Sequence, residues 1–426
     1  MLKLLKVLHH TQQIGTLSCY GDITRFRPDP SYVEAAGIPV LTQQLIGDSD
    51  QDTRVILQSA SDARLSAQGR LPLYFEHLLP EGPNAERLAR ERGCASDDQF
   101  ELLAAAGHDL MGAVEVVPLP MDELTDEILS WHATLGLDHA DLQIVDEPME
   151  DGFSLGGVQT KFSMVKEGHR YALRKHTEAG SVIAKLPSTK HPDLVENEFT
   201  CLALIAAIGQ STAQVDICKV TELDVPVELP FEHYLWVLRF DRTAEGQRTH
   251  MEEFAQIAGV RPKNKYGNLD TYTKVLSILR RFSDRGVADV EDCIKRQIAF
   301  ALQGNTDAHL KNWAIRYTGP SSFKLAPVYD AVSVSSFFER NPKDYGVNRA
   351  IDQRMHNDWN GDYFEEVARQ AGVAKPAVAR KWVRETVEAC RDIWPRRLQD
   401  LPCPPGLAEH ITGRLKSLGD SLLVAT

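Results

Sequence analysis

The sequence predicts an α+β protein in which a strand-rich part is followed, from about Thr249, by a mostly helical part. Two observations carry this prediction. Short apolar runs separated by polar turns recur up to residue 242, and apolar residues then recur at helical spacing. The length of 426 residues, with 43% hydrophobic and 25% charged residues, suits a globular chain with two or three cores. We place the domains at residues 1–120, 121–242 and 243–426.

The first domain is predicted to be a compact α/β subdomain. Strand patterns occur in it at residues 5–8, 14–20 and 113–118, the first two separated by a polar turn as in a hairpin. From Tyr74 to about Leu103 the pattern is helical. Its helices are predicted to begin at Asn84 and at Asp97 or Asp98, because short polar side chains are good N-cap residues.

The two later domains differ in their predicted secondary structure. The second has strand patterns at residues 161–165, 181–186 and 234–240, and one amphipathic helix at residues 194–208. The third is predicted to be helical at residues 251–257, 271–282, 291–304, 363–371 and 377–394. Strands before helices, with acids at the junction, is the layout of a bilobal protein kinase, an analogy of fold alone.

Charge and cysteine content exclude several classes of function. A net charge of −13 argues against nonspecific nucleic-acid binding by the chain alone, since such binding depends on neutralising phosphates with Lys and Arg. The seven cysteines have no Cys-x-x-Cys spacing and are expected to be reduced thiols. With no apolar run long enough to span a bilayer and no signal peptide, we expect a cytoplasmic protein without a membrane partner.

Three polar residues in apolar surroundings have the spacing of a phosphoryl-transfer site. Asn312 follows Asp307 by five residues, and Asp330 follows Asn312 by 18. Protein kinases use an Asp, an Asn and a later Asp in this way, as the catalytic base and two magnesium ligands. Capping and turn residues are the alternative, but these need not keep kinase spacing. The set therefore predicts Asp307 as the base and Asn312 and Asp330 as Mg²⁺ ligands.

A lysine and a glutamate supply the ion pair that such a site needs. Lys185 interrupts the apolar strand at residues 181–186, where an unpaired charge would cost desolvation. Glu198 follows 13 residues later on the predicted helix, and the two match the Lys–Glu pair that orders ATP phosphates in kinases. An edge-strand lysine and an exposed helical glutamate are the alternatives.

Two further stretches would complete a nucleotide site. Gly156 and Gly157 precede a predicted strand and would let backbone N–H groups approach a phosphate, although a glycine turn explains them equally well. Residues 238–242 end an apolar strand at the place where kinases join their lobes and meet adenine. A strand end with ordinary salt bridges is the alternative there.

Six short motifs occur in a fixed order: Ser154-x-x-Gly-x-Gln-x-Lys161, Ala184-Lys185-Leu186-Pro187, Asn197-Glu198, Arg239-Phe240-Asp241-Arg242, Asn305-Thr306-Asp307-Ala308-His309-Leu310-Lys311-Asn312 and Pro327-Val328-Tyr329-Asp330. In this order they resemble the HipA-type serine/threonine kinases, toxins of bacterial HipBA toxin–antitoxin modules. The resemblance spans nearly the whole chain. Residues 1–120 resemble the family's N-terminal subdomain, through Phe75-Glu76-His77-Leu78-Leu79-Pro80 and Gly107-x-x-x-x-Gly112-Ala113-Val114.

The resemblance implies a role for each site residue. Asp307 would be the catalytic base, Asn312 and Asp330 would hold Mg²⁺, and Lys185 would hold the α- and β-phosphates of ATP. The remaining nucleotide contacts are expected from Leu238 and Phe240, which would bind adenine through their backbones, from the phosphate-loop residues Gly156, Gly157, Val158, Gln159, Thr160 and Lys161, and from Glu198, His309 and Tyr329.

The resemblance also implies a regulatory phosphorylation. The family autophosphorylates the serine at the position of Ser154, which expels the loop from the ATP site. Phosphate adds about two negative charges beside those of the nucleotide, so repulsion is the expected cause. Thr160 stands where well-known members have Glu, which affects loop dynamics. Ser163 is a second hydroxyl nearby and an alternative acceptor.

The activity and partners implied by the resemblance are those of a toxin. The chain would phosphorylate a translation component such as an aminoacyl-tRNA synthetase, the glutamyl-tRNA synthetase class being the best-known target. A small HipB-like helix-turn-helix antitoxin would restrain it, and DNA would be reached only through that complex. The C-terminal basic residues Arg380, Lys381, Arg384, Arg391, Arg396 and Arg397 could touch DNA there, although a solvated basic face is the preferred interpretation.

Two other classes of function stay open from the sequence. A kinase-shaped corepressor would work only by binding its antitoxin and DNA, but the metal and base residues argue against it. A small-molecule phosphotransferase would use the same ATP site with another acceptor.

Overall fold

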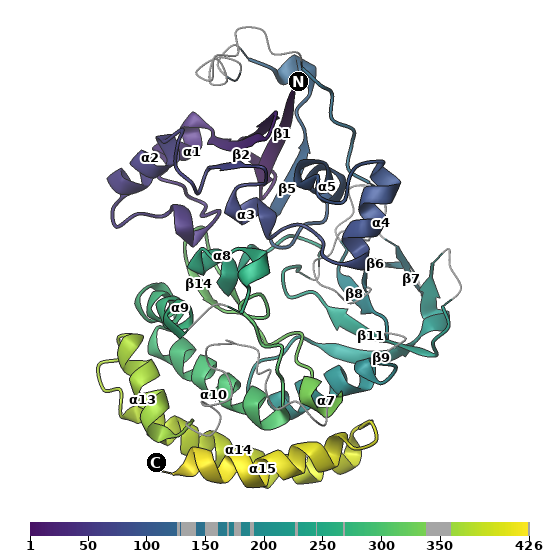
Figure 1. Ribbon diagram of the computed structural model, residues 1–426, viewed down its shortest axis with the longest axis vertical. Coiled ribbons are helices and arrows are strands. Elements are labelled where there is room, and N and C mark those ends of the chain that lie inside the picture. The colour runs from purple at the N-terminus through teal and green to yellow at the C-terminus, as the bar shows by residue number, and fades with distance from the viewer. Residues whose placement is uncertain are drawn as a thin grey trace. The chain divides into compact units, whose positions relative to one another are not determined.

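The computed structural model describes residues 1–125, 128, 142–149, 161–167, 170–173, 180–187, 191–225, 229–243, 245–266, 269–337 and 359–424. By its internal contacts the chain divides into two units, whose elements are labelled in Figure 1. Unit 1 comprises Met1–Ser181 and Asp241–His250, and unit 2 comprises Val182–Phe240 and Met251–Thr426. Both units combine helices with sheets, so the predicted α+β class is confirmed.

The sheet of unit 1 is antiparallel and consists of β1 (Leu2–His9), β2 (Gln12–Tyr20), β3 (Ile23–Pro28), β4 (Ser66–Gln68) and β5 (Val114–Pro118). The strand order is β4-β3-β2-β1-β5. Leu5 of β1 pairs with Leu17 of β2 and Pro118 of β5, which confirms the predicted hairpin and closing strand. Leu5 and Val7, two residues apart and therefore on one face, are fully buried. A second hairpin, β6 (Lys161–Glu167) and β7 (Arg170–Leu173), also belongs to this unit.

The helices of unit 1 are α1 (Pro30–Glu34), α2 (Asp50–Gln58), α3 (Leu73–Glu76), α4 (Pro83–Arg92) and α5 (Gln99–Ala106). α5 begins as predicted, since the Asp98 side chain accepts a 3.1 Å hydrogen bond from the Glu101 N–H. The prediction of Asn84 as an N-cap is wrong. α4 begins at Pro83 after Gly82, because proline has no N–H to leave unpaired in the first turn.

Residues Asp241–His250 come from the middle of the chain but belong to unit 1. Arg242 anchors them: its side chain is 1% exposed and lies 3.1 Å from the buried Asp109 carboxylate. Its guanidinium also donates hydrogen bonds of 3.0 Å to the carbonyls of Leu110 and Gly112. Because an unpaired buried charge is costly, these bonds fix the segment in unit 1. The strand end at residues 238–242 therefore carries a salt bridge, between Arg242 and Asp109, and this salt bridge is buried.

Two buried histidines meet in the same unit. The rings of His9 and His250 have centroids 4.4 Å apart, and each residue is 1% exposed. His250 Nε2 lies 2.9 Å from the Leu41 carbonyl, whereas neither ring nitrogen of His9 has a hydrogen-bond partner among the described residues. Burial lowers the pKa of both imidazoles, that of His250 to about 3. Both side chains are therefore neutral at pH 7.

Unit 2 begins with a sheet and a helix. β11 (His233–Leu238) pairs antiparallel with β8 (Val182–Lys185) on one side and with β9 (Val215–Lys219) on the other, and β10 (Leu223–Asp224) is a short further strand. α7 (Leu194–Ala207) confirms the predicted amphipathic helix to within one residue. Its Val195 shares a buried cluster with Leu235 and Val237 of β11, so the helix covers this sheet through apolar contacts.

The rest of unit 2 is mostly helical: α8 (Phe254–Ala258), α9 (Leu269–Phe282), α10 (Val287–Gln303), α11 (Val334–Phe337), α13 (Gly361–Gln370), α14 (Val378–Asp400) and α15 (Leu407–Leu423). A small sheet of β12 (Met251–Glu253), β13 (Ala314–Tyr317) and β14 (Phe323–Leu325) lies among them, with β13 central. α14 and α15 run side by side in Figure 1.

Two helix predictions in unit 2 need correction. The predicted helix at residues 251–257 begins with strand β12, because Glu252 pairs with Ile315 far along the chain. α14 continues through Pro395 to Asp400 and does not end at Trp394. Trp394 is fully buried and its Nε1 donates a 2.8 Å hydrogen bond to the Leu204 carbonyl of α7. Tertiary packing therefore overrides the proline.

All seven cysteines are free thiols, as expected. Cys201, Cys293 and Cys390 are fully buried, and burial raises the pKa of each thiol. Within the described ranges no helix is long and apolar enough to cross a membrane.

We predict that the buried histidines make unit 1 sensitive to acid. Because the folded pKa lies below the ordinary 6.5, the unfolded chain binds the extra protons, and stability falls as the pH drops from about 6.5 towards 3. As the pH drops from about 5.5 to about 4.5, the free energy of unfolding should fall less steeply in His9→Phe than in the parent. The two slopes should differ by about 1.4 kcal/mol per pH unit. Urea unfolding of the full chain measures this. Equal slopes in the parent, His9→Phe and the control His233→Phe would contradict it.

Candidate active site

The buried ammonium group of Lys185 is the centre of the candidate site. Lys185 ends β8 with a side chain 5% exposed, and its Nζ lies 2.6 Å from Oε1 of Glu198 on α7. The same Nζ forms a second ion pair with Asp330. The side chains of Glu198 and Asp330 are 2% and 32% exposed. Since an unpaired buried charge is costly, two carboxylates make this position favourable for lysine.

Asp330 is positioned by backbone pairing of the residues before it. Val328 forms a parallel bridge with Thr212. Its N–H donates to the Ser211 carbonyl at 2.8 Å, and its carbonyl accepts from the Ala213 N–H at 2.7 Å. Asp330 itself has φ = +52°, in the left-handed region that aspartate tolerates better than most residues. The extended segment therefore ends at the residue that meets Lys185.

The loop that carries Asp307 is folded by its own amide side chains. α10 ends at Gly304, whose φ is +79°. Asn305 Oδ1 accepts a 3.0 Å hydrogen bond from the Asp307 N–H, and Asn312 Nδ2 donates to the Asp307 carbonyl at 2.7 Å. The spacing of five residues between Asp307 and Asn312 thus has a physical reason, because the amide closes the loop onto the backbone of the acid.

The Asp307 carboxylate is the most accessible acid of the site, with a side chain 49% exposed. Tyr266 donates its hydroxyl to Oδ1 at 2.9 Å, and His309 Nε2 lies 3.8 Å from the same oxygen. His309 is 4% exposed, and burial lowers its pKa. Tyr266 was missed by the sequence reasoning, because it lies 41 residues before Asp307 in a loop without a motif. Oδ1 of the Asp307 carboxylate thus accepts a hydrogen bond from Tyr266, while the carboxylate as a whole stays half exposed to solvent.

Tyr329 connects this loop to the predicted adenine-binding residues. Its hydroxyl donates to the Lys311 carbonyl at 2.9 Å, and its ring lies 5.4 Å from that of Phe240 between centroids. Leu238 is 37% exposed, but its N–H donates to the Gln214 carbonyl at 2.9 Å. A backbone contact from Leu238 to adenine would therefore have to use its carbonyl.

The donor set fits a magnesium ion. Asn312 and Asp330 offer oxygen atoms, and Mg²⁺ is usually held by one or two protein oxygens, with waters and substrate phosphates completing the octahedron. Because the Asn312 Nδ2 is directed to the Asp307 carbonyl, its Oδ1 is the atom left for a metal. Over the described part of the chain no cluster of three or more His, Cys, Asp or Glu could hold a metal by itself.

Part of the predicted site lies outside the described residues: Ser154, Gly156, Gly157, Val158, Gln159 and Thr160. Lys161 is described as the half-buried first residue of β6 in unit 1. Ser163, the alternative phosphorylation site, is 0% exposed in the same strand, so its hydroxyl is inaccessible. Burial therefore argues against Ser163 as an acceptor.

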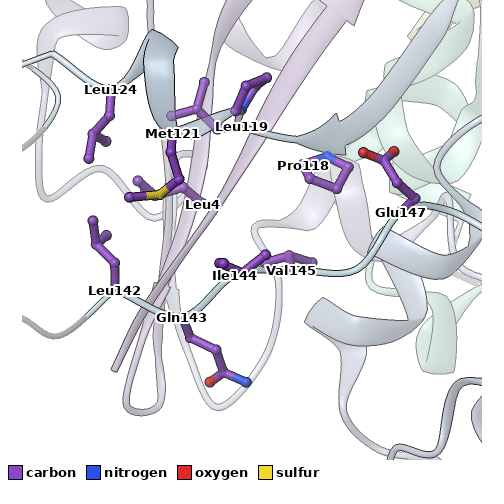
Figure 2. A pocket seen from close by; sticks show the side chains of 11 residues that line it. Leu4, Pro118, Leu119, Met121, Leu124, Leu142, Gln143, Ile144, Val145 and Glu147 are labelled. Carbon is purple, nitrogen blue, oxygen red and sulfur yellow. The ribbon is translucent and has the colours of Figure 1, made fainter.

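A separate hollow of about 180 Å³ lies in unit 1 (Figure 2). Leu4, Pro118, Met121 and Ile144 are among its mainly apolar lining residues. None of the described residues of the predicted site is among its lining residues, and the acid that lines it is Glu147. Phosphates need cationic or N–H donors, so this hollow is not the nucleotide site.

Comparisons with known proteins agree with the motifs. Residues 153–394 match the family model described as the HipA-like C-terminal domain, and residues 5–117 match the HipA N-terminal domain. A Sinorhizobium fredii protein named as a kinase, Y4dM, is 33% identical over 351 residues, which cover 80% of each chain. The serine/threonine-protein kinase toxin HipA of Shewanella oneidensis is 30% identical over 303 residues, 63% of this chain and 64% of that protein.

A solved structure shows the same fold. It contains HipA of Shewanella oneidensis with HipB and its operator DNA. The match covers 99% of this chain and 97% of that one, with a TM-score of 0.66 and 21% sequence identity.

We predict that Gly304→Ala lowers the free energy of unfolding by about 2–5 kcal/mol. The alanine would have to adopt a left-handed backbone conformation, and its Cβ would also overlap with neighbouring atoms. A Cβ at Gly304 would collide with Ser335 Oγ and lie 2.9 Å from His410 Nε2. Gly372 is the matched control: its φ is +80° and a Cβ there meets nothing within 4 Å. Gly372→Ala should cost about 1–2 kcal/mol. Urea unfolding measures both, and equal losses would contradict the close approach at Gly304.

Proposed function

The chain belongs to the HipA family, and on that premise we propose that it is an ATP- and Mg²⁺-dependent serine/threonine-protein kinase. The observation that carries the proposal is Lys185 held between Glu198 and Asp330. Such a cation, within ion-pair distance of a predicted metal ligand, suits the binding of nucleotide phosphates. The half-exposed Asp307 carboxylate is then the group that an acceptor hydroxyl can reach.

Each residue has a physical task in this mechanism. Glu198 holds the Lys185 ammonium in place, so that it meets the phosphates without having to reorganise. Asp307 accepts the proton of the acceptor hydroxyl, which makes the oxygen a better nucleophile. Asn312 and Asp330 would hold Mg²⁺, which neutralises charge on the transferred phosphoryl group when it is bound. Tyr266 hydrogen-bonds Oδ1 of Asp307 and restrains the carboxylate.

The toxin role and its partners follow from the relatives. The Shewanella oneidensis relative is named a serine/threonine-protein kinase toxin. The solved structure of HipA from that organism includes HipB and operator DNA. We propose a HipB-like antitoxin as partner, an aminoacyl-tRNA synthetase as substrate and Ser154 as the site of autophosphorylation. The full burial of Ser163 supports Ser154 as the acceptor within the chain.

The basic residues of α14 support indirect contact with DNA. Arg380 forms ion pairs with Asp362 and Glu365, and Arg391 forms one with Asp420. Acids of the chain therefore neutralise part of the basic face. Since nonspecific DNA binding needs unneutralised cations, this favours the proposal that DNA is reached through an antitoxin.

The base assignment predicts a large loss of phosphoryl transfer. Incubation of the full chain with labelled ATP and Mg²⁺ should label protein, and Asp307→Asn should lower the rate by about 10²–10⁴-fold. Asp284→Asn, at an acid of unit 2 that bonds Thr318, is the control and should keep the parent rate. Equal label with Asp307→Asn, or none with the parent, would sink the kinase proposal.

The acceptor proposal predicts a defined phosphoproteome. Inducing the parent, but not Asp307→Asn, should give a new phosphoserine or phosphothreonine on an aminoacyl-tRNA synthetase, and a phosphate at Ser154 of the chain itself. Mass spectrometry of the cell extract measures both. Label confined to the chain would favour a small-molecule phosphotransferase. Repression by the chain with its antitoxin, without any label, would favour the corepressor.

A further inference from the structure

Asn197, the neighbour of Glu198 on α7, grips the segment that follows Asp330. It is 1% exposed, and its Oδ1 accepts a 2.8 Å hydrogen bond from the Ser333 N–H. Its Nδ2 donates to the Ser333 carbonyl at 3.4 Å and to Ser336 Oγ at 3.2 Å. One amide side chain, which carries both a donor and an acceptor, therefore bonds both backbone groups of a single residue.

Ser333 passes this connection on to α10. Its Oγ donates a 2.6 Å hydrogen bond to the Gln303 carbonyl, and Gln303 Nε2 donates at 2.8 Å to the Cys201 carbonyl. Cys201 lies one helical turn after Asn197 on α7, so the bonds close a circuit. Ser333, Gln303 and Cys201 are each 0% exposed. Buried polar groups bonded to one another in this way restrain the segments that carry them, and Gln303 Oε1 is the one polar side-chain atom of Asn197, Ser333 and Gln303 without a hydrogen-bond partner among the described residues.

The circuit joins the three segments that carry the chemistry. Asn197 precedes Glu198, Ser333 follows Asp330 by three residues, and Gln303 precedes the loop of Asp307 by one residue. Glu198 reaches Asp330 through Lys185, while Asn197 reaches the same segment directly. The α7 helix thus holds the metal-ligand segment at two points, and the loop of Asp307 through Ser333.

We propose that Asn197 is a positioning residue for phosphoryl transfer, which sets Asp330 and the loop of Asp307 relative to Glu198 through Ser333 and Gln303. The inference rests on the proposed kinase function. Displacing reacting groups by about 1 Å can cost on the order of 10²-fold in rate, so a buried circuit between these segments has direct value for catalysis. Asn197 itself touches neither of the two aspartates in this arrangement and acts through the backbone.

The test uses two variants that break different bonds of the circuit. Asn197→Ala removes the grip on the Ser333 backbone, and Ser333→Ala removes the bond to Gln303 while keeping that backbone. Thr200→Val is the matched control: Thr200 is on the same helix, 0% exposed, and its Oγ1 has no hydrogen-bond partner in the described structure. Ser333→Ala deletes one oxygen atom, so it keeps the proposal testable if Asn197→Ala fails to fold.

Two readouts are expected to change together. In the full chain without nucleotide, amide hydrogen exchange of residues 328–337 should become at least about tenfold faster in both variants and stay at the parent rate in Thr200→Val. In the kinase assay, both variants should lower kcat by roughly tenfold or more with a smaller change in KM for ATP. The double variant should be little worse than the worse single one, because the bonds act as a unit.

The outcomes separate this inference from the kinase proposal. Absence of phosphoryl transfer by the parent chain would contradict the kinase proposal. Amide hydrogen exchange would in that case still test whether the hydrogen-bonded circuit restrains residues 328–337. An active parent with unchanged kcat in Asn197→Ala and Ser333→Ala would overturn the positioning role. Strictly additive effects, or an equal loss in Thr200→Val, would also overturn it, since both indicate general destabilisation of α7.

Discussion

The structure of the site depends on one buried cation. Lys185 is 4% exposed at the end of β8, and two carboxylates, Glu198 and Asp330, compensate its charge. Neither partner could be lost cheaply, because breaking a buried pair leaves an uncompensated charge in a poorly solvated place. β8, α7 and the segment at Asp330 must therefore come together whenever unit 2 folds. In the proposed function, nucleotide phosphates would add anions to a cation that is already in position.

The segments around this cation are held by different means, which suits their tasks. Lys185 and Glu198 lie on regular elements, where side-chain positions are set by the sheet and the helix. Asp307 lies on a loop closed by the side chains of Asn305 and Asn312, and its carboxylate stays half exposed. Lys185 and Glu198, which we propose for phosphate binding, are thus buried on regular elements, whereas Asp307, the proposed base, is accessible to an acceptor.

Contacts between residues at kinase-like spacing could be predicted from the sequence. Asp307, Asn312, Asp330 and the Lys185–Glu198 pair were found by spacing, and the structure joins Lys185 to Glu198 and Asp330. Contacts that depend on long-range folding were not. Tyr266 meets Asp307 across 41 residues without a motif of its own. Asn197 belongs to the Asn197-Glu198 motif, but its contact with Ser333 spans 136 residues and does not follow from that motif. The same limit explains the missed strand β12, whose pairing partner lies in β13.

The chemistry of α7 explains why its two neighbouring polar residues differ. Glu198 faces a cation, so a full negative charge is favourable there. Asn197 faces the N–H and the carbonyl of Ser333, and a carboxylate could not donate to that carbonyl and would bury a second charge. A neutral amide is the side chain that satisfies both groups. Charge compensation at Glu198 and backbone recognition at Asn197 are therefore separate demands, and together they hold the segment of Asp330 to one helix.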